Sequence, residues 1–242
     1  MKQRQSKSRS SSMADHDHAG HRERRKERFR REGLDGFQPH EVLELLLYFG
    51  IPQGDTNPLA HQLIKRFGSF SQVLDASYED LLTVPGIGKH TATLLTLIPP
   101  LCRYYLCDAQ KPKAALLDSK AMAEYIRPYF VGATNECFYL ISLNAQNQVL
   151  LVEKLAEGSW SEVIVYPALV VTAALKNRCR SVVLAHNHPG NSTKVTSSDI
   201  ELTRTLIHAL SGVGVTVIDH IIIAGEQYVS FAENGYIRQA QG

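Results

Sequence analysis

"SVVLAHNHPGNSTKVTSSDIELTRTLIHAL" (residues 181–210) contains a strand pattern, a polar turn and a helix pattern in direct succession. Residues 182–185 are all apolar, which is typical of a strand buried on both faces of a sheet. Pro189 ends this strand, and small polar residues follow it. After Ser197, apolar residues recur at helical spacing, namely Ile200, Leu202, Leu206, Ile207 and Leu210. A buried strand followed by an amphipathic helix indicates a sheet with helices packed on it.

Two histidines and an aspartate stand around this turn. His186 and His188 are one residue apart at the end of the strand, and Asp199 follows His188 by eleven residues. Side chains at i and i+2 of an extended segment point to the same side, so both imidazoles enter one space. A hydrolytic zinc site takes three such ligands and keeps one position for water. The pattern predicts a metal site; the simpler alternative is three polar residues on a loop.

The whole chain has 242 residues, of which 44% are hydrophobic, and a net charge of +2. These values predict one large or two modest globular domains. No apolar run reaches the ~18 residues that cross a bilayer, and the basic start lacks the apolar region of a secretory signal. We therefore expect a cytoplasmic protein with no membrane partner. The four cysteines form no C-x-x-C pair, which favours reduced thiols over a cysteine zinc site.

Positive charge is concentrated at the N-terminus. Residues 1–32 carry eleven Lys or Arg against five Asp or Glu, and the rest carries fifteen against nineteen. Residues 1–20 lack apolar periodicity and predict a disordered basic tail, in which Met13 is an alternative start of the protein. "HRERRKERFRRE" (21–32) predicts a basic helical arm. Such an arm could meet an acidic partner such as nucleic acid.

Residues 21–108 predict an all-helical domain. "HEVLELLLYFG" (40–50) has apolar residues three and four positions apart, and "NPLAHQLIKRFGS" (57–69) opens with a capping Asn and a Pro. Pro99-Pro100 is expected to bend or break the last helix of this domain. Residues 109–119 are expected to form a linker, because apolar periodicity is lost there.

A glycine turn lies within this helical domain. "VPGIGKHTA" (84–92) stands between two helical segments, and it resembles the helix-hairpin-helix motif of non-specific DNA binders. In this interpretation Gly86 and Gly88 let backbone N–H groups approach a phosphate, and Lys89 adds a side-chain contact. The alternative is a tight connection in which the glycines serve helix packing alone.

Residues 120–242 change character from helical to mixed. "ECFYLISLN" (136–144) and "QVLLVEKLA" (148–156) flank a turn and predict a hairpin, and "VTVIDHIIIAG" (215–225) predicts a further strand. Strands and helices in this order predict a mixed α/β sandwich. Asp219 and His220 form a polar pair within that last strand. They are either partners of the ligating histidines or a contact at the edge of the core.

The metal pattern is similar to a known signature. His186, His188, Pro189, Thr196 and Asp199 form H-x-H-P-x6-T-x2-D, which resembles the JAMM (MPN+) metallopeptidase signature H-x-H-P-x6-S-x2-D. The resemblance implies that His186, His188 and Asp199 bind Zn²⁺ and that Thr196, at the serine position, stabilises the oxyanion. It also implies a glutamate on the first strand as general base. Glu136 is the best candidate, and the alternatives on the next strand are Glu153 and Glu157.

From about Gly20 onward the chain resembles the RadC family. The matching stretches are "HEVLELLLYFGIP", "RFGSFSQVLDAS", "VPGIGKHTA", "SVVLAHNHPG", "SSDIELTRTL" and "DHIIIAGEQYVSF". The resemblance implies a helix-hairpin-helix domain before a three-layer α/β/α JAMM/MPN domain, which is cytidine-deaminase-like in fold. The loop Pro189–Val195 departs from the family pattern, since it lacks the later prolines.

The implied function is a zinc metallopeptidase or isopeptidase that cuts an amide bond in a protein or peptide substrate, with DNA as a second partner. One alternative is a DNA-binding accessory protein of repair or recombination, in which the metal domain is structural or a binding module. Another is a base deaminase, whose zinc signature combines H-x-E with P-C-x-x-C. That signature is missing from this sequence. Neither the oligomeric state nor the scissile bond follows from these patterns.

Overall fold

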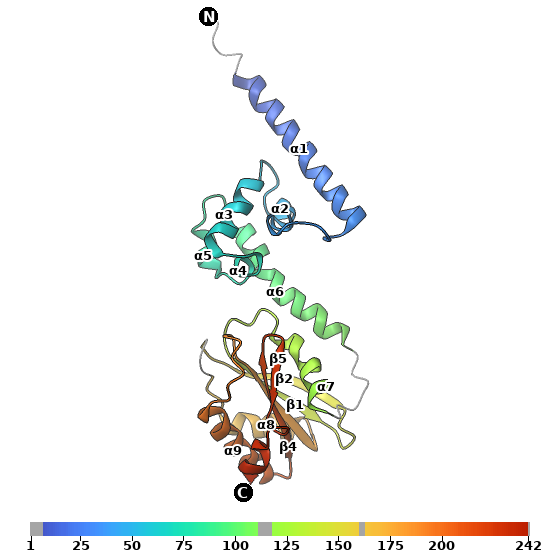
Figure 1. Cartoon of the computed structure of the whole chain (residues 1–242), viewed down its shortest axis with the longest axis vertical. Helices are drawn as coiled ribbons and strands as arrows, with labels where there is room; N and C mark the ends of the chain where they lie inside the picture. Colours follow the sequence, from blue (N-terminus) through green and yellow to red (C-terminus); the bar gives the residue numbers. More distant parts are fainter. Residues whose placement is uncertain (1–6, 111–117, 160–162, 242) are drawn as a thin grey trace, which may run out of the picture. The chain divides into compact units, whose positions relative to one another are not determined.

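The computed structural model describes residues 7–110, 118–159 and 163–241 of the chain (Figure 1). The chain forms two compact units, Met1–Leu101 and Cys102–Gly242. The boundary between them falls within α6 (Lys89–Ala109), ahead of the segment 109–119 that the sequence predicts as a linker. Most of that segment, residues 111–117, lies outside the described residues.

The first unit is helical, as the sequence predicts. Its core is made of apolar side chains from α2 to α6, among them Leu43, Leu47, Leu63, Leu81 and Leu95. Ser69 and Ser77 start the two shortest helices, since each hydroxyl accepts a hydrogen bond from the backbone N–H three residues later. The helices that precede α6 are α1 (Lys7–Glu32), α2 (Pro39–Gly50), α3 (Asn57–Phe67), α4 (Phe70–Leu74) and α5 (Tyr78–Leu82).

α1 spans Lys7–Glu32, and the disordered tail expected for residues 1–20 stays a prediction. One helix differs from the sequence-based expectation. α6 is one continuous helix that includes Pro99 and Pro100, so the break expected there is absent. Two adjacent prolines remove only two helical hydrogen bonds, and the turns on either side keep theirs.

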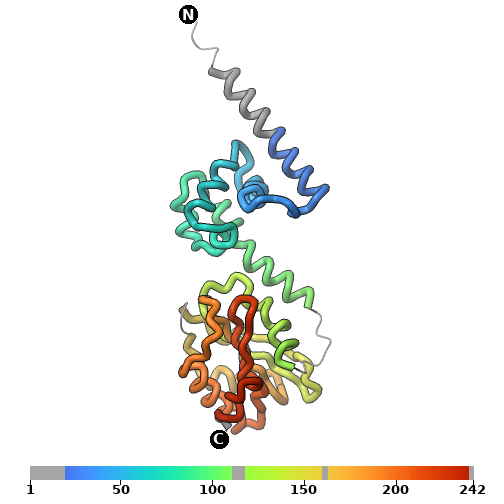
Figure 2. Tube along the Cα trace, viewed as in Figure 1, coloured from blue at the N-terminus to red at the C-terminus, as the bar shows by residue number. Residues whose placement is uncertain are grey.

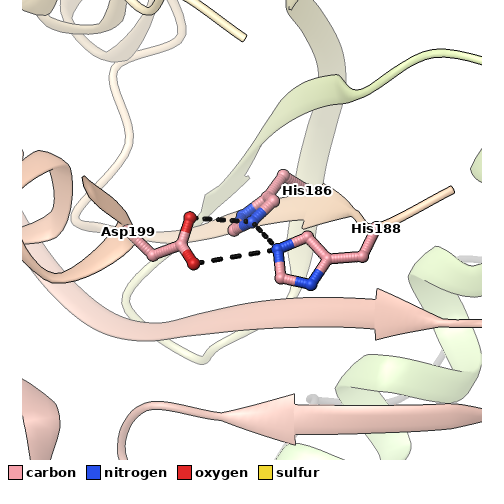
Figure 3. A group of neighbouring side chains, drawn as sticks. All are labelled: His186, His188 and Asp199. Carbon is pink, nitrogen blue, oxygen red and sulfur yellow. Dashed lines mark hydrogen bonds and ion pairs between the residues drawn. The ribbon is translucent and has the colours of Figure 1, made fainter. Parts of the chain in front are cut away.

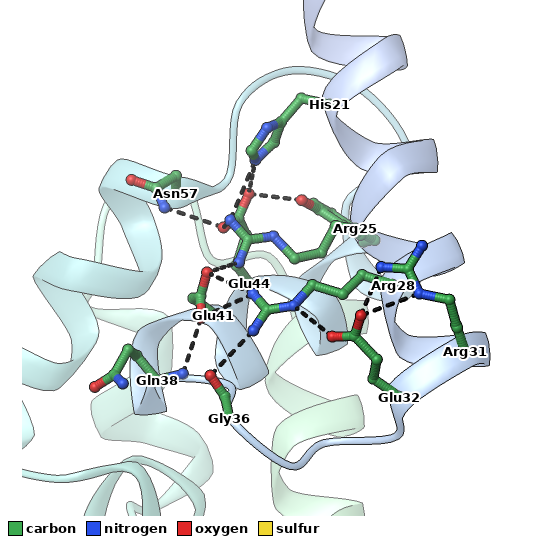
Figure 4. A network of polar contacts seen from close by, with 11 residues as sticks. His21, Arg25, Arg28, Arg31, Glu32, Gly36, Gln38, Glu41, Glu44 and Asn57 are labelled. Carbon is green, nitrogen blue, oxygen red and sulfur yellow. Dashed lines mark hydrogen bonds and ion pairs between the residues drawn. The ribbon is translucent and has the colours of Figure 1, made fainter.

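The basic arm is joined to α2 by a network of ion pairs (Figure 4). Arg25 of α1 pairs with Glu41, and its guanidinium lies 3.2 Å from the carboxylate of Glu44. Glu44 is fully buried and also accepts hydrogen bonds from Tyr48 Oη at 2.6 Å and Asn57 Nδ2 at 3.0 Å. Burial by itself would raise the pKa of Glu44, but these hydrogen bonds and the charge of Arg25 hold that pKa below its usual range.

Many cations of the arm therefore have partners within the chain. Arg22 donates to the backbone carbonyls of Ile51 and Gly54, and Arg28 pairs with Glu32 and Glu41. Arg30 and Arg31 pair with the acidic residues of α1 itself. The excess positive charge that the sequence places in residues 1–32 is thus partly neutralised by folding, which weakens its attraction for an external polyanion.

The second unit is built on a five-stranded sheet with the order β2-β1-β3-β4-β5. β3 and β4 run parallel, and the other neighbouring pairs are antiparallel. The predicted hairpin is confirmed as the β1–β2 pair. The parallel pair needs a crossover, and α9 provides it between β3 and β4. The strands are β1 (Cys137–Leu143), β2 (Val149–Glu157), β3 (Ser181–Asn187), β4 (Thr216–Ala224) and β5 (Gln227–Ser230).

Helices cover both faces of this sheet, as the chain trace in Figure 2 also shows. One face packs on α7 (Ser119–Ile126) and the 3-10 turn η1 (Arg127–Phe130); the other packs on α8 (Pro167–Lys176), α9 (Ser197–Ser211) and α10 (Tyr236–Gln241). Alternate residues of β3 enter the two cores, Val182 and Leu184 on the α9 side and Val183 and Ala185 on the α7 side. The mixed, three-layer α/β/α fold is thereby confirmed.

Within the described residues, none of the helices combines the length and the apolar composition that a membrane crossing requires. The cytoplasmic location stays a prediction.

Candidate metal centre

β3 delivers two histidines to the α9 face of the sheet. His186 continues the alternation of Val182 and Leu184, and His188 follows two residues later, just beyond the strand end. Both imidazoles are buried, with 2% and 9% of their residue surface exposed. Figure 3 shows the two rings turned toward one another, and their Nε2 atoms lie 3.1 Å apart.

Asp199 comes to the same point from the first turn of α9. Its Oδ1 lies 3.2 Å from His186 Nε2, and its Oδ2 lies 3.7 Å from His188 Nε2. The helix start fixes this position, because Asp199 Oδ2 accepts from the N–H of Thr196 while Thr196 Oγ1 accepts from the N–H of Asp199.

These donors fit a zinc ion. The candidate ligand atoms of the three residues all lie within 4.8 Å of one another. In a tetrahedral site with zinc–nitrogen and zinc–oxygen distances near 2.0–2.1 Å, ligand atoms stand about 3.4 Å apart. His186 Nε2 lies 3.1 Å from His188 Nε2 and 3.2 Å from Asp199 Oδ1, and both separations are close to that value. Two imidazole nitrogens and one carboxylate are also the donor types that zinc takes in hydrolytic enzymes.

Each histidine uses its other ring nitrogen in a hydrogen bond. His188 Nδ1 lies 2.7 Å from the backbone oxygen of Ser192, in the loop that follows Pro189. His186 Nδ1 lies 2.8 Å from Nε2 of His220 on β4. Complete burial, followed by the proximity of His186, holds the pKa of His220 well below its usual range, so this ring is neutral. Ligating histidines are commonly held through their second nitrogen in this way.

Only one member of the polar pair on β4 contacts the candidate ligands. Asp219 instead accepts hydrogen bonds from the hydroxyls of Ser119 and Ser230 and from the N–H of Ala232. His220 contacts His186 through one ring nitrogen, and its other ring nitrogen contacts the hydroxyl of Thr203 on α9. Sequence reasoning missed Thr203. Its only sequence signal is its place one helical turn after Asp199.

Glu136 directly precedes β1, the strand that pairs with the strand of the histidines. Phe138 lies opposite His186 in the antiparallel β1–β3 pair, and the N–H of Cys137 donates to Asn187 Oδ1 at 2.7 Å. Glu136 stands two residues before Phe138, the spacing at which side chains of an extended segment share a face. Its backbone is fixed by hydrogen bonds with Gly158 and Ser159.

The two alternative glutamates, Glu153 and Glu157, lie on the neighbouring strand β2. Glu157 is opposite Cys137, whose side chain faces the α7 core, and it pairs with Lys154 at 2.5 Å. Glu153 is opposite Leu140, farther along the sheet from His188, and it accepts a hydrogen bond from Asn177. The choice of Glu136 among the three candidates stays a prediction.

Thr196 is exposed at the N-terminus of α9, and its hydroxyl oxygen caps the helix. Accepting a hydrogen bond from the N–H of Asp199 leaves the hydroxyl proton available for a second partner. A cavity of about 240 Å³ has His188 in its lining, whereas His186, Thr196 and Asp199 do not line it. Its lining includes Arg127, Phe130, Asn187, Pro189 and Ile223.

The glycine turn belongs to the first unit, and the cluster belongs to the second. Gly86 has a φ of +94°, a conformation that favours glycine, whereas Gly88 does not have a positive φ. Val84 and Ile87 are buried in the helical core, while Gly86, Gly88 and Lys89 are exposed. The turn thus anchors itself through its apolar residues and presents the glycines and the first residue of α6 outward.

Comparison with known proteins matches both parts of the chain. Residues 116–236 match the family described as the RadC-like JAB domain, and residues 17–93 match the family described as UPF0758 N-terminal. A UPF0758 protein of Fusobacterium nucleatum is 36% identical over 93% of this chain and 100% of its own length. UPF0758 proteins of Paraburkholderia xenovorans and Paraburkholderia phytofirmans are each 32% identical over 87% of this chain, covering 83% and 82% of those proteins.

Proposed function

The chain belongs to the family of the RadC-like JAB domain, and from this premise we propose that it is a zinc-dependent hydrolase of amide bonds, a metallopeptidase or isopeptidase. The observation that carries the proposal is the convergence of two imidazole nitrogens and a carboxylate within 4.8 Å of one another. Among the described residues this cluster offers three protein ligands. Structural zinc sites usually close with four, so three ligands favour a catalytic site over the structural alternative.

The proposed reaction adds water across an amide bond of a protein or peptide. His186, His188 and Asp199 hold the metal, which when bound acidifies water and polarises a carbonyl. The Glu136 carboxylate takes one proton from the attacking water as the new C–O bond forms, and it passes that proton to the leaving amine as the C–N bond breaks. The Thr196 hydroxyl donates a hydrogen bond to the oxygen that becomes negatively charged.

Zinc analysis of the purified full-length protein tests the site directly. Wild-type protein is expected to hold one zinc per chain, and His188→Ala is expected to lose it. His208→Ala is the matched control, because His208 is an exposed histidine on α9. Equal zinc in the wild-type and His188→Ala proteins would refute the assignment. The same preparations, incubated with a peptide library, show whether amide cleavage follows the zinc content.

We also propose that the first unit docks on DNA through the glycine turn. The support is the outward display of Gly86, Gly88 and Lys89 beside two buried anchors. Backbone N–H groups at the start of α6 are suited to a phosphate oxygen. This proposal is compatible with the hydrolase, because the two sites belong to different units. It also keeps open the alternative of a DNA-binding accessory protein.

A further inference from the structure

We propose that His220 and Thr203 are positioning residues that decide which ring nitrogen of His186 is offered to the metal. They form a one-way chain of hydrogen bonds from the backbone carbonyl of Asp199 to the imidazole of His186. This inference rests on the proposed metal site and adds residues that the metal signature does not contain.

The donor-to-acceptor direction of these hydrogen bonds is set at the Asp199 carbonyl. Thr203 Oγ1 lies 2.6 Å from the carbonyl oxygen of Asp199 and 2.6 Å from Nδ1 of His220. Two oxygen atoms at such a distance repel each other unless a proton lies between them, and a carbonyl can only accept. The Thr203 hydroxyl therefore donates to Asp199, and its oxygen is left to accept from His220.

Each later step follows from the previous one. His220 carries its proton on Nδ1, and a fully buried ring whose hydrogen-bond partners are a hydroxyl and another imidazole does not gain a second, charged proton, so its Nε2 is an acceptor. The contact of 2.8 Å between His220 Nε2 and His186 Nδ1 then requires the proton to be on His186 Nδ1. His186 Nε2 is consequently left with a lone pair, and this is the atom that faces Asp199 and His188.

Packing holds the hydrogen-bonded side chains of His220 and Thr203 in place. His220 and Thr203 have no exposed surface, and the His220 ring packs against the rings of Phe138 and Phe231, with ring centroids 6.0 and 4.7 Å away. A ring in such a position cannot turn over without displacing aromatic neighbours. Water has no access to replace either partner, so loss of one hydrogen bond leaves a buried group unsatisfied.

The two histidines are thus oriented by different means. His188 donates Nδ1–H directly to the Ser192 carbonyl, which can only accept, so backbone alone fixes its tautomer. His186 depends on two side chains, and for that reason its support can be removed by mutation. This series of hydrogen bonds ends on the backbone carbonyl of Asp199. The residue that supplies the third ligand therefore also fixes the position of the proton on His186, the first ligand.

The experiment compares Thr203→Val with Thr203→Ser in the full-length protein. Valine keeps the shape of threonine and removes the hydroxyl, whereas serine keeps the hydroxyl. Thr205→Val, an exposed position two residues along α9, controls for the substitution itself. Zinc affinity is measured by competition with a chromophoric chelator. The tautomer of His186 is read in zinc-free protein from its ring ¹⁵N shifts.

We expect Thr203→Val to bind zinc about 10- to 100-fold more weakly than wild type, the usual effect of losing such a support. Its His186 is expected to gain the Nε2–H tautomer, while Thr203→Ser and Thr205→Val behave as wild type. His220→Leu is expected to resemble Thr203→Val, and His220→Gln, which keeps one acceptor and one donor, to recover part of the affinity.

The outcomes separate this inference from the proposed function. If wild-type protein binds no zinc, the proposed metal site is wrong. If wild type binds zinc and Thr203→Val matches Thr205→Val in both affinity and tautomer, the positioning role is overturned and the metal site stands. Because the tautomer is measured without metal, the second result does not depend on enzymatic activity.

Discussion

Phe138 of β1 lies directly opposite His186 of β3, and this pairing fixes what can stand beside the candidate metal site. Opposite residues of antiparallel strands share a face, and side chains alternate along each strand. Glu136 stands two residues before Phe138, just ahead of β1, and the proposed mechanism requires its carboxylate to reach a water held at the metal.

Glu136→Gln is expected to abolish most amide hydrolysis while zinc binding is retained. The amide has the size of the carboxylate but cannot take up a proton, and general base catalysis typically contributes about 10²–10⁴-fold. Steady-state rates on a peptide identified by library cleavage, together with zinc content, measure this. Glu153→Gln and Glu157→Gln are controls on β2 and should keep wild-type rates. Full activity of Glu136→Gln would exclude Glu136 as the base.

Substitutions at Thr196 separate helix capping from catalysis. Thr196→Asp is expected to preserve the thermal stability of the protein, because aspartate caps helices about as well as serine does. It cannot donate a hydrogen bond when ionised, so the rate of hydrolysis should fall by about 10²–10³-fold. Thr196→Ser keeps both functions and should stay near wild type. Equal rates for the Asp and Ser variants, at equal zinc content, would remove the oxyanion role.

Glu44→Gln is expected to loosen α1 from α2 in a pH-dependent way. Removing one partner of a buried ion pair costs about 3–5 kcal/mol. The pKa of Glu44 in the folded protein lies below its ordinary value of 4.5. Its contribution to stability is therefore complete above that pH and is lost as the pH falls through the folded pKa.

Hydrogen–deuterium exchange of residues 21–57 in the full chain measures this effect. Wild type and Glu44→Gln should differ most at neutral pH and converge in acid. Glu32→Gln, whose ion pairs are at the surface, should change exchange little. A difference between wild type and Glu44→Gln that grows as the pH falls would contradict the sign of this pKa shift.

The parts of the molecule that the sequence predicts well are local ones. The strand before His186 and the helix after Asp199 each follow from apolar spacing over fewer than twenty residues. Their junction, with two histidines on one face, follows from the same spacing. The three-layer fold follows from the order of strands and helices.

What the sequence does not predict depends on contacts between distant residues. His220 and Asp219 are adjacent, and which of them meets His186 is decided by the β3–β4 register, including its irregularity between Val182 and Val183. Thr203 contacts His220 only because α9 packs on β4. Phe49 illustrates the converse, since its helical spacing is typical of a buried stripe, yet 66% of it is exposed. Spacing indicates a helix but does not decide which side meets the core.

The two glycines of the turn offer a matched pair of substitutions that tests DNA docking. An added Cβ at Gly86 meets only the Leu59 side chain at 3.6–3.7 Å, so its cost comes from the φ of +94°, about 1–2 kcal/mol. Gly88 has open space around it and no positive φ, so Gly88→Ala should keep the turn.

We expect Gly86→Ala to weaken binding to single-stranded or branched DNA and Gly88→Ala to weaken it less. Lys89→Ala should lower the salt dependence of affinity by about one counterion. Binding measured over a range of salt concentrations gives all three values. Affinity that does not change with salt, or that is the same in all variants, would show that this turn does not contact a phosphate.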